Sequence, residues 1–204
     1  MKQIRVFLLV LTVMAFFSVV QAQSNEPLAI LMTADGTIMP PMLEYFKRGI
    51  KTAEQRNAEV LVIQLNTPGG SVSVMSEMIT AIGNSTVPVV IYVSPKDAQA
   101  ASAGALITMA GHASAMSPRT VIGAASPIDS SGADIESTLE KKIKEDLKAK
   151  ARTLVERRGP QAIQLAEAMI DDAKAVTATE ALEAKLIDFI SDDTEDLLQS
   201  LNGF

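Results

Sequence analysis

The sequence predicts a single α/β domain built on a mostly parallel sheet. Short apolar runs alternate with segments whose apolar residues recur at helical spacing, and the run at 59–65 is apolar on both faces, like a buried parallel strand. This alternation of strand and helix is typical of parallel strands joined by right-handed crossovers. The length of 204 residues fits one domain, and a hydrophobic content of 48% is sufficient for a substantial core.

The expected elements follow one another with turn signals between them. We expect strands at residues 28–32, 59–65, 87–93, 120–124 and 186–190. We expect helices at residues 40–57, 72–84, 102–111, 136–158, 161–170 and 180–184. The polar stretch 125–133, which contains several Ser and Gly residues, is expected to be a loop.

The N-terminal 22 residues have a different character from the rest. Lys2 and Arg5 precede an apolar run at 6–20, which Gln21 and the small residue Ala22 follow. This order predicts a secretory signal peptide at residues 1–22, so the domain comprises residues 23–204 and is exported to the periplasm or another extracytoplasmic site. A retained membrane anchor is the alternative, but the run of about 15 residues is short for a span of about 20.

Composition excludes several classes of function. The net charge of −6 argues against nucleic-acid binding, which requires a basic surface. The absence of cysteine excludes disulfides and thiolate chemistry. With one histidine and no carboxylate cluster evident, we expect neither a metal nor a cofactor.

Two glycine- and alanine-rich stretches follow neighbouring predicted strands. Asn66-Thr67-Pro68-Gly69-Gly70 ends one strand, and Ser102 stands among small residues after the next. Ligands bind at this end of the strands in open α/β sheets, and backbone N–H groups before a helix can hold a developing oxyanion. Taken singly, the first stretch fits an ordinary glycine turn and Ser102 a helix N-cap. Together they supply the nucleophile and the donors that acyl transfer requires.

A serine nucleophile also requires a base. His112, the one histidine, would lie about 15 Å from Ser102 along a continuous helix, so we expect it to be structural. A lysine is the remaining candidate, and the long predicted helix supplies Lys141, Lys142, Lys144, Lys148 and Lys150. A lysine working near neutrality needs its pKa lowered by about three units, or roughly 4 kcal/mol, and here only desolvation could supply that.

Five segments carry a resemblance to a known family. They are NTPGGSV, PVVIYVSPKDAQAASAGALITMAGHASAMSP, TVIGAASPI, EKKIKEDLKAKARTLVERRG and TATEALEAKLID. In this order they resemble the NfeD-type membrane-bound serine proteases of the ClpP class, over essentially the whole chain after residue 22. The resemblance implies the ClpP/crotonase-like fold of stacked ββα units. It also implies endopeptidase activity by a Ser/Lys dyad.

The resemblance implies a role for each matching residue. The nucleophile falls on Ser102, and the oxyanion donors fall on the N–H groups of Gly70 and Ala103, with Gly69 shaping the turn. The base falls on Lys142, with Asp146 one turn later. In the triad of ClpP a histidine follows the nucleophile helix, and Gly123 stands at the matching place.

The resemblance also implies partners. We expect extended apolar protein segments as substrates, including those of stomatin-like membrane proteins, and a homo-oligomer of two or more copies. Relatives commonly continue into membrane helices and a small β-barrel, so a separate membrane-anchoring NfeD partner is also expected. Two rival functions share the fold: an acyl-CoA enzyme of the crotonase group and a non-catalytic peptide-binding or scaffold domain.

Overall fold

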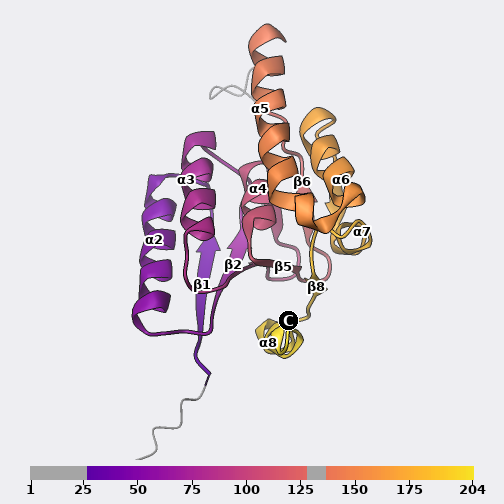
Figure 1. Ribbon diagram of the computed structural model, residues 1–204. Coiled ribbons are helices and arrows are strands. Elements are labelled where there is room, and N and C mark those ends of the chain that lie inside the picture. The colour runs from indigo at the N-terminus through magenta and orange to yellow at the C-terminus, as the bar shows by residue number, and fades with distance from the viewer. Residues whose placement is uncertain (1–26, 128–136) are drawn as a thin grey trace, which may run out of the picture.

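A five-stranded parallel sheet forms the centre of the molecule. The computed structural model describes residues 27–127 and 137–204 (Figure 1). The strands lie in the order β1 (Ala29–Asp35), β2 (Val60–Asn66), β3 (Val89–Val93), β5 (Ala113–Met116) and β8 (Phe189–Ile190), and every neighbouring pair is parallel. The predicted parallel α/β architecture is confirmed.

A second, three-stranded sheet adjoins the first at the carboxyl end of β2. It consists of β4 (Gln99–Ala101), β6 (Val121–Gly123) and β7 (Ala175–Thr177). The β4–β6 pair is parallel and the β6–β7 pair antiparallel. A parallel bridge between Thr67 and Ala100 joins this sheet to the segment that follows β2.

Helices cover both faces of the main sheet. Alternate residues of β2 show this: Leu61, Ile63 and Leu65 enter a core with α2 (Pro40–Gln55), α3 (Val72–Gly83) and α4 (Ala103–Ala110). Val62, on the opposite face, packs in a smaller cluster with Leu197 of α8 (Thr194–Leu201). Because successive side chains of a strand point to opposite faces, a strand covered on both sides is predominantly apolar.

The long helix α5 (Ser137–Val155) continues into a 3-10 turn (Glu156–Arg158) and is followed by α6 (Pro160–Asp171) and the short α7 (Ala178–Glu183). Figure 1 shows the outer end of α5 projecting beyond the rest of the molecule. Its other end is anchored, because the guanidinium of Arg158 donates to both carboxylate oxygens of Asp188 at 2.6 and 2.8 Å. These side chains are only 4% and 15% exposed.

The expected elements are confirmed with ends that differ by at most three residues. Three strands, β4, β5 and β7, and helix α8 were not predicted. The predicted signal peptide and most of the predicted loop lie outside the described residues.

Candidate active site

The segment after β2 and the start of α4 are held against each other by backbone hydrogen bonds. The N–H of Thr67 donates to the carbonyl of Gln99 at 2.8 Å, and the N–H of Ala101 donates to the carbonyl of Thr67 at 3.0 Å. The two stretches that the sequence singled out therefore meet at one place. This place, comprising Thr67 to Gly70 and Ala101 to Gly104, is called the nucleophile corner below.

Ser102 has a strained backbone at the junction of β4 and α4. Its φ of 53° and ψ of −120° lie outside the regions that a residue with a Cβ ordinarily adopts. Such conformations cost about 1–3 kcal/mol and persist only where the surroundings impose them. Here the N–H of Ser102 donates to the carbonyl of Gly123 at 2.8 Å. The side chain makes no capping hydrogen bond, so a helix N-cap does not explain this serine.

Gly69 lies directly against Ser102. A Cβ built on Gly69 would stand 2.6 Å from the Cβ and 3.1 Å from the Oγ of Ser102, and the φ of Gly69 is +109°. Only glycine fits there. The N–H of Gly69 is already used, since it donates to the hydroxyl of Thr67 at 3.1 Å. Gly69 thus shapes the turn and offers no donor to a substrate.

Two other backbone N–H groups stand next to these residues. The N–H of Gly70 donates to no group among the described residues, and its φ of +155° and close approach to Ile38 admit no side chain. Ala103 is the first residue of α4, so its N–H has no acceptor within the helix. Gly69 lies against Ser102, and Gly70 and Ala103 are the next residues along the chain from these two. Backbone donors of this kind can stabilise an oxyanion.

The part that Thr67 plays in the nucleophile corner was not predicted from the sequence. Thr67 is fully buried, and its hydroxyl accepts the N–H of Gly69. Its methyl group packs against Gly104: a Cβ built on Gly104 would stand 2.5 Å from the Cγ2 of Thr67. Thr67 therefore sets both the turn of Gly69 and the distance to α4. Its position directly after an apolar strand was the available signal, but a threonine there is also a common turn residue.

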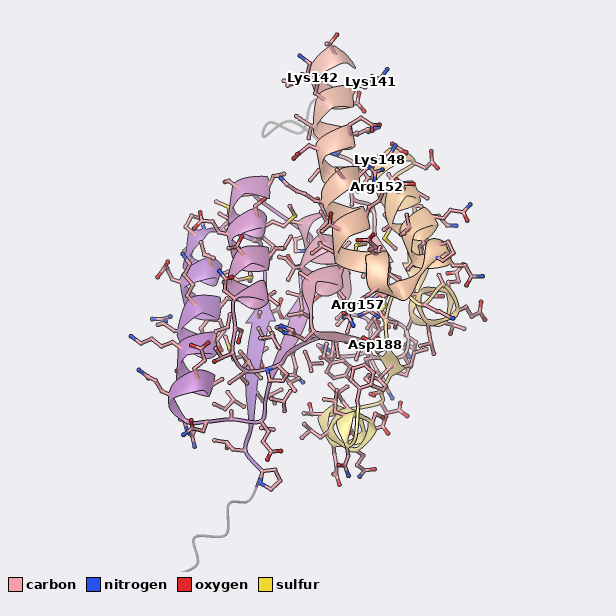
Figure 2. The ribbon with its side chains drawn as sticks, viewed as in Figure 1. Lys141, Lys142, Lys148, Arg152, Arg157 and Asp188 are labelled. Atoms are coloured by element: carbon pink, nitrogen blue, oxygen red, sulfur yellow. The ribbon has the colours of Figure 1, made fainter. Side chains whose placement is uncertain are left out.

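The predicted base is not brought to the nucleophile corner. Lys141 and Lys142 are exposed at the projecting end of α5 (Figure 2). Neither has an ion-pair or hydrogen-bond partner within residues 27–127 and 137–204. Asp146, expected one turn from Lys142, pairs with Lys150 at 2.8 Å. The apolar cover that a lysine base requires is not present around Lys142 in the described chain.

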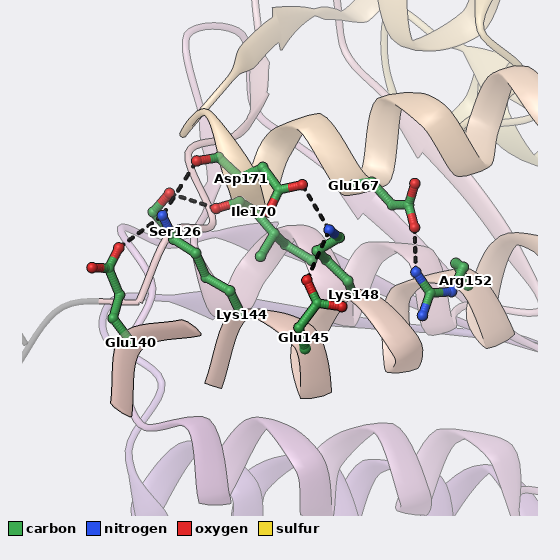
Figure 3. A network of polar contacts seen from close by, with 9 residues as sticks. All are labelled: Ser126, Glu140, Lys144, Glu145, Lys148, Arg152, Glu167, Ile170 and Asp171. Carbon is green, nitrogen blue, oxygen red and sulfur yellow. Dashed lines mark hydrogen bonds and ion pairs between the residues drawn. The ribbon is translucent and has the colours of Figure 1, made fainter. Parts of the chain in front are cut away.

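Ion pairs fix α5 to α6 (Figure 3). Lys148 lies 2.8 Å from Asp171 and 3.2 Å from Glu145, and these two hydrogen bonds raise the pKa of Lys148. Lys144 pairs with Glu140 at 2.8 Å and donates to the carbonyl of Asp171 at 3.3 Å. One turn or more toward the C-terminus, Arg152 pairs with Glu167. We call these contacts the α5–α6 clamp.

His112 is remote from the nucleophile. It lies beyond the opposite end of α4 from Ser102, where its Nδ1 accepts the N–H of Val89 at 3.0 Å. Burial and the nearby Arg157 lower the pKa of His112. Gly123, at the end of β6, has a φ of +131°, and a Cβ there would stand 2.2 Å from the carbonyl oxygen of Lys174. A histidine cannot occupy this position without movement of the backbone.

The family model of the NfeD1b N-terminal domain matches residues 31–202. The chain belongs to the NfeD1b N-terminal domain family. The curated membrane-bound protease PH1510 of Pyrococcus horikoshii is 38% identical over 171 residues, which are 82% of this chain and 38% of that protein. The chain thus spans well under half the length of this relative.

Solved structures agree with the NfeD1b assignment. A serine-to-alanine variant of the 1510-N membrane-bound stomatin-specific protease has a TM-score of 0.81 at 34% identity, covering 88% of this chain and 86% of that one. A lysine-to-alanine variant in complex with a substrate peptide has a TM-score of 0.81 at 33% identity, covering 88% and 82%. ClpP1 from Listeria monocytogenes, 17% identical with a TM-score of 0.65 over 82% and 94%, shares the fold. The predicted ClpP-like fold is confirmed.

The described part of this NfeD1b domain contains neither a membrane-crossing helix nor a metal-binding cluster. No helix within residues 27–127 and 137–204 has both the length and the apolar character needed to cross a bilayer. The same residues contain no group of three His, Cys, Asp or Glu side chains that could hold a metal ion. A cavity of about 690 Å³ lies between α8 and the amino ends of the strands, at the opposite end of the sheet from Ser102.

Proposed function

We propose that this chain is the protease domain of an exported serine endopeptidase, with Ser102 as nucleophile. The observation that carries the proposal is the strained backbone of Ser102, which is held against Gly69 beside the N–H groups of Gly70 and Ala103. Strain that the surroundings impose on a serine is characteristic of functional sites. A serine that served only to cap α4 would not require a strained backbone conformation.

The proposed reaction uses Lys142 as general base. Its neutral amine takes the proton from the Ser102 hydroxyl as the oxygen attacks a peptide carbonyl, and the Gly70 and Ala103 N–H groups hold the oxyanion. The resulting ammonium gives its proton to the departing amine, which leaves an ester on Ser102. Water, losing a proton to the same amine, then attacks the ester. The resulting ammonium returns this proton to the departing Ser102 oxygen, so the acid, the free hydroxyl and the neutral amine are restored.

The relatives support this division of roles. PH1510 is named a protease, and the 1510-N structures include a serine variant and a lysine variant, the latter with a substrate peptide. We infer that the present chain also takes an extended peptide, entering along the nucleophile corner. Met39 and Val72, close in the chain to the paired residues Ile38 and Gly70, are 49% and 43% exposed. Such exposed apolar side chains favour apolar residues around the scissile bond.

The names of the relatives also suggest a cellular setting. 1510-N is described as specific for stomatin, so we propose a stomatin-like membrane protein as substrate. We further propose export by the signal peptide at residues 1–22, a homo-oligomeric state, and a separate membrane-anchoring NfeD partner. These proposals apply to residues 23–204 as the protease domain.

A non-catalytic peptide-binding domain is the second candidate, and one observation favours it. Lys142 is exposed at the end of α5, whereas a working base requires shielding from water. Such a domain would retain the nucleophile corner as a peptide groove and would not cleave.

Cleavage of an unfolded, apolar-rich protein by residues 23–204 tests the proposal. We expect Ser102→Ala and Lys142→Ala each to lower the rate by at least about a thousand-fold, because the two groups act as one unit. Lys150→Ala is the matched control and should retain activity, because Lys150 pairs with Asp146 on the same helix. Circular dichroism and sedimentation establish that each variant folds and assembles. Undiminished cleavage by Ser102→Ala would refute the protease mechanism, and binding without cleavage by the wild type would establish the second candidate.

A further inference from the structure

The projecting end of α5 lies outside the core of its own chain. From residue 138 onward, Leu147 is the first buried residue of α5, and Lys142 precedes it by five residues, or about 7.5 Å along the axis. Leu139, one turn further out, is 50% exposed. Figure 2 shows Lys141 and Lys142 at this outer end, beyond the neighbouring helices. We call residues 138–142 the α5 tip.

The phase of the helix turns Lys142 away from the body. Ala151 is fully buried against the core, and it follows Lys142 by nine residues, or two and a half turns. The two side chains therefore leave α5 on opposite sides. A lysine that served Ser102 of its own chain would project from the core-facing side. Lys142 instead faces outward from the molecule to which it belongs.

The α5–α6 clamp opposes a rearrangement that would bring Lys142 inward. Lys144, two residues after Lys142, is held by Glu140 and by the carbonyl of Asp171. Lys148 and Arg152 continue the clamp along the same side of α5. Reorienting Lys142 requires unwinding the first turn of α5 or breaking these contacts. Bringing another molecule to the α5 tip requires neither.

The charge and polarity of the α5 tip match the nucleophile end of a second copy. Within the α5 tip, Glu140 pairs with Lys144, whereas Lys141 and Lys142 are exposed, so the tip presents a local cationic surface on an acidic protein. At the carboxyl end of the strands, Asp35, Met39 and Val72 are exposed. This surface offers apolar contacts to Leu139 and a carboxylate to the lysines.

We propose that the active site is completed between copies of this chain, with Lys142 of one copy serving as the base for Ser102 of another. This inference rests on the proposed protease function and specifies how that function is regulated. Docking of the α5 tip removes water from the Lys142 amine, which favours the neutral form that can accept a proton. The separate chain holds a strained nucleophile without a base and is inactive. Assembly supplies both the base and its desolvation.

Mixing of two inactive variants tests this arrangement directly. Ser102→Ala retains Lys142, and Lys142→Ala retains Ser102, so neither chain can complete a site within itself. We expect assemblies formed from equal amounts of the two, co-expressed with different affinity tags and purified through both, to regain cleavage. In an equal mixture, half of the copies carry Ser102 and the other half carry Lys142. Random pairing between neighbours therefore gives one site in four both groups, in a dimer or in a ring, so an unselected mixture should recover about a quarter of the wild-type rate. Ser102→Ala mixed with the double variant is the control and should remain inactive.

The outcomes separate this inference from the proposed function. If the wild type cleaves, both single variants are inactive and their mixed assemblies stay inactive, the dyad lies within one chain and the inference fails while the protease function stands. The inference also fails if the wild type sediments as a monomer at concentrations where it cleaves. If the wild type does not cleave, the proposed function fails first.

Substitution at the α5 tip provides an independent measurement. Leu139→Asp should weaken association and lower activity at least ten-fold at low protein concentration, with recovery as the concentration rises. Leu182→Asp introduces the same charge at another leucine, 37% exposed on α7, and should leave both properties unchanged. Equal activity of Leu139→Asp and wild type at every concentration would contradict docking through the α5 tip.

Discussion

The nucleophile corner and the α5 tip differ in how completely their surroundings determine them. In the nucleophile corner, three backbone hydrogen bonds and two glycines without room for a Cβ hold Ser102 in one strained geometry. At the α5 tip, Lys142 is exposed and has no polar contact among the described residues. One half of the proposed dyad is thus fixed by the fold of the single chain, and the other half is not.

This difference indicates that the single chain can maintain the geometry of the nucleophile but not the neutral form of the base. A strained serine beside backbone donors is stable on its own, because its neighbours enforce the geometry. A neutral lysine amine requires exclusion of water, which a projecting helix cannot provide by itself. Separating the two parts makes activity depend on what covers the α5 tip.

The largest loss of stability and activity is expected at Gly70, where the nucleophile corner has no room for a Cβ. Gly70→Ala places a Cβ 2.3 Å from the carbonyl oxygen of Ile38 at a φ of +155°, so we expect a loss of roughly 2 to 4 kcal/mol of unfolding free energy and no measurable cleavage. Urea denaturation followed by circular dichroism measures the stability. Gly36→Ala is the matched control, since its φ is also positive at +118° but its Cβ would meet nothing within 4 Å. Equal losses in the two variants would mean that positive φ alone, and not crowding, determines the cost.

An intermediate effect is expected from the hydroxyl of Thr67. Thr67→Val keeps the methyl contact with Gly104 but leaves the N–H of Gly69 without its acceptor, at a cost of about 1–2 kcal/mol. A small displacement of the turn should lower kcat by about 10- to 100-fold. Thr120→Val, another fully buried threonine whose hydroxyl donates to Ser117, should lose similar stability without the loss in kcat. Unchanged kcat in Thr67→Val would show that the turn is held without this bond.

The smallest effect is expected from the α5–α6 clamp. Asp171→Asn removes the charge that pairs with Lys148, so the outer half of α5 should open more often, while the nucleophile corner is unaffected. Hydrogen exchange of the amides at 141–147 should accelerate by a factor of at most about five, because the pair lies near the surface. Asp172→Asn, an exposed neighbour with no ion pair among the described residues, is the control. Equal acceleration in both would assign the effect to α6 in general.

Sequence patterns were sufficient to predict the strands and helices that bury strongly apolar residues. The strands β2 and β3 are covered on both faces, and that environment favours the predominantly apolar runs by which they were predicted. The strand β5, Ala-Ser-Ala-Met, is also fully buried but consists of small residues without β-branched side chains, so its pattern gives no strand signal. The helix α8 was missed because its eight residues include one fully buried side chain, Leu197.

The candidate site was predictable in its residues but not in its backbone geometry. The small residues around Ser102 indicated close approach, yet its positive φ depends on the carbonyl of Gly123, which is 21 residues later in the chain. The role of Thr67 depends likewise on contacts with β4 and Gly104. For Lys142 the resemblance supplied the assignment, and the helical phase that turns it outward follows from which residues of α5 become buried.

The tight packing around Gly123 has a consequence for enzyme design. Introducing an imidazole there by one substitution would drive a side chain into the carbonyl of Lys174 and disturb the strand that holds the serine amide in place. Conversion to histidine-based chemistry therefore requires rebuilding the connection between α6 and β7 together with the end of β6. The backbone bond that orients the nucleophile thus also restricts which kinds of base the scaffold can accept.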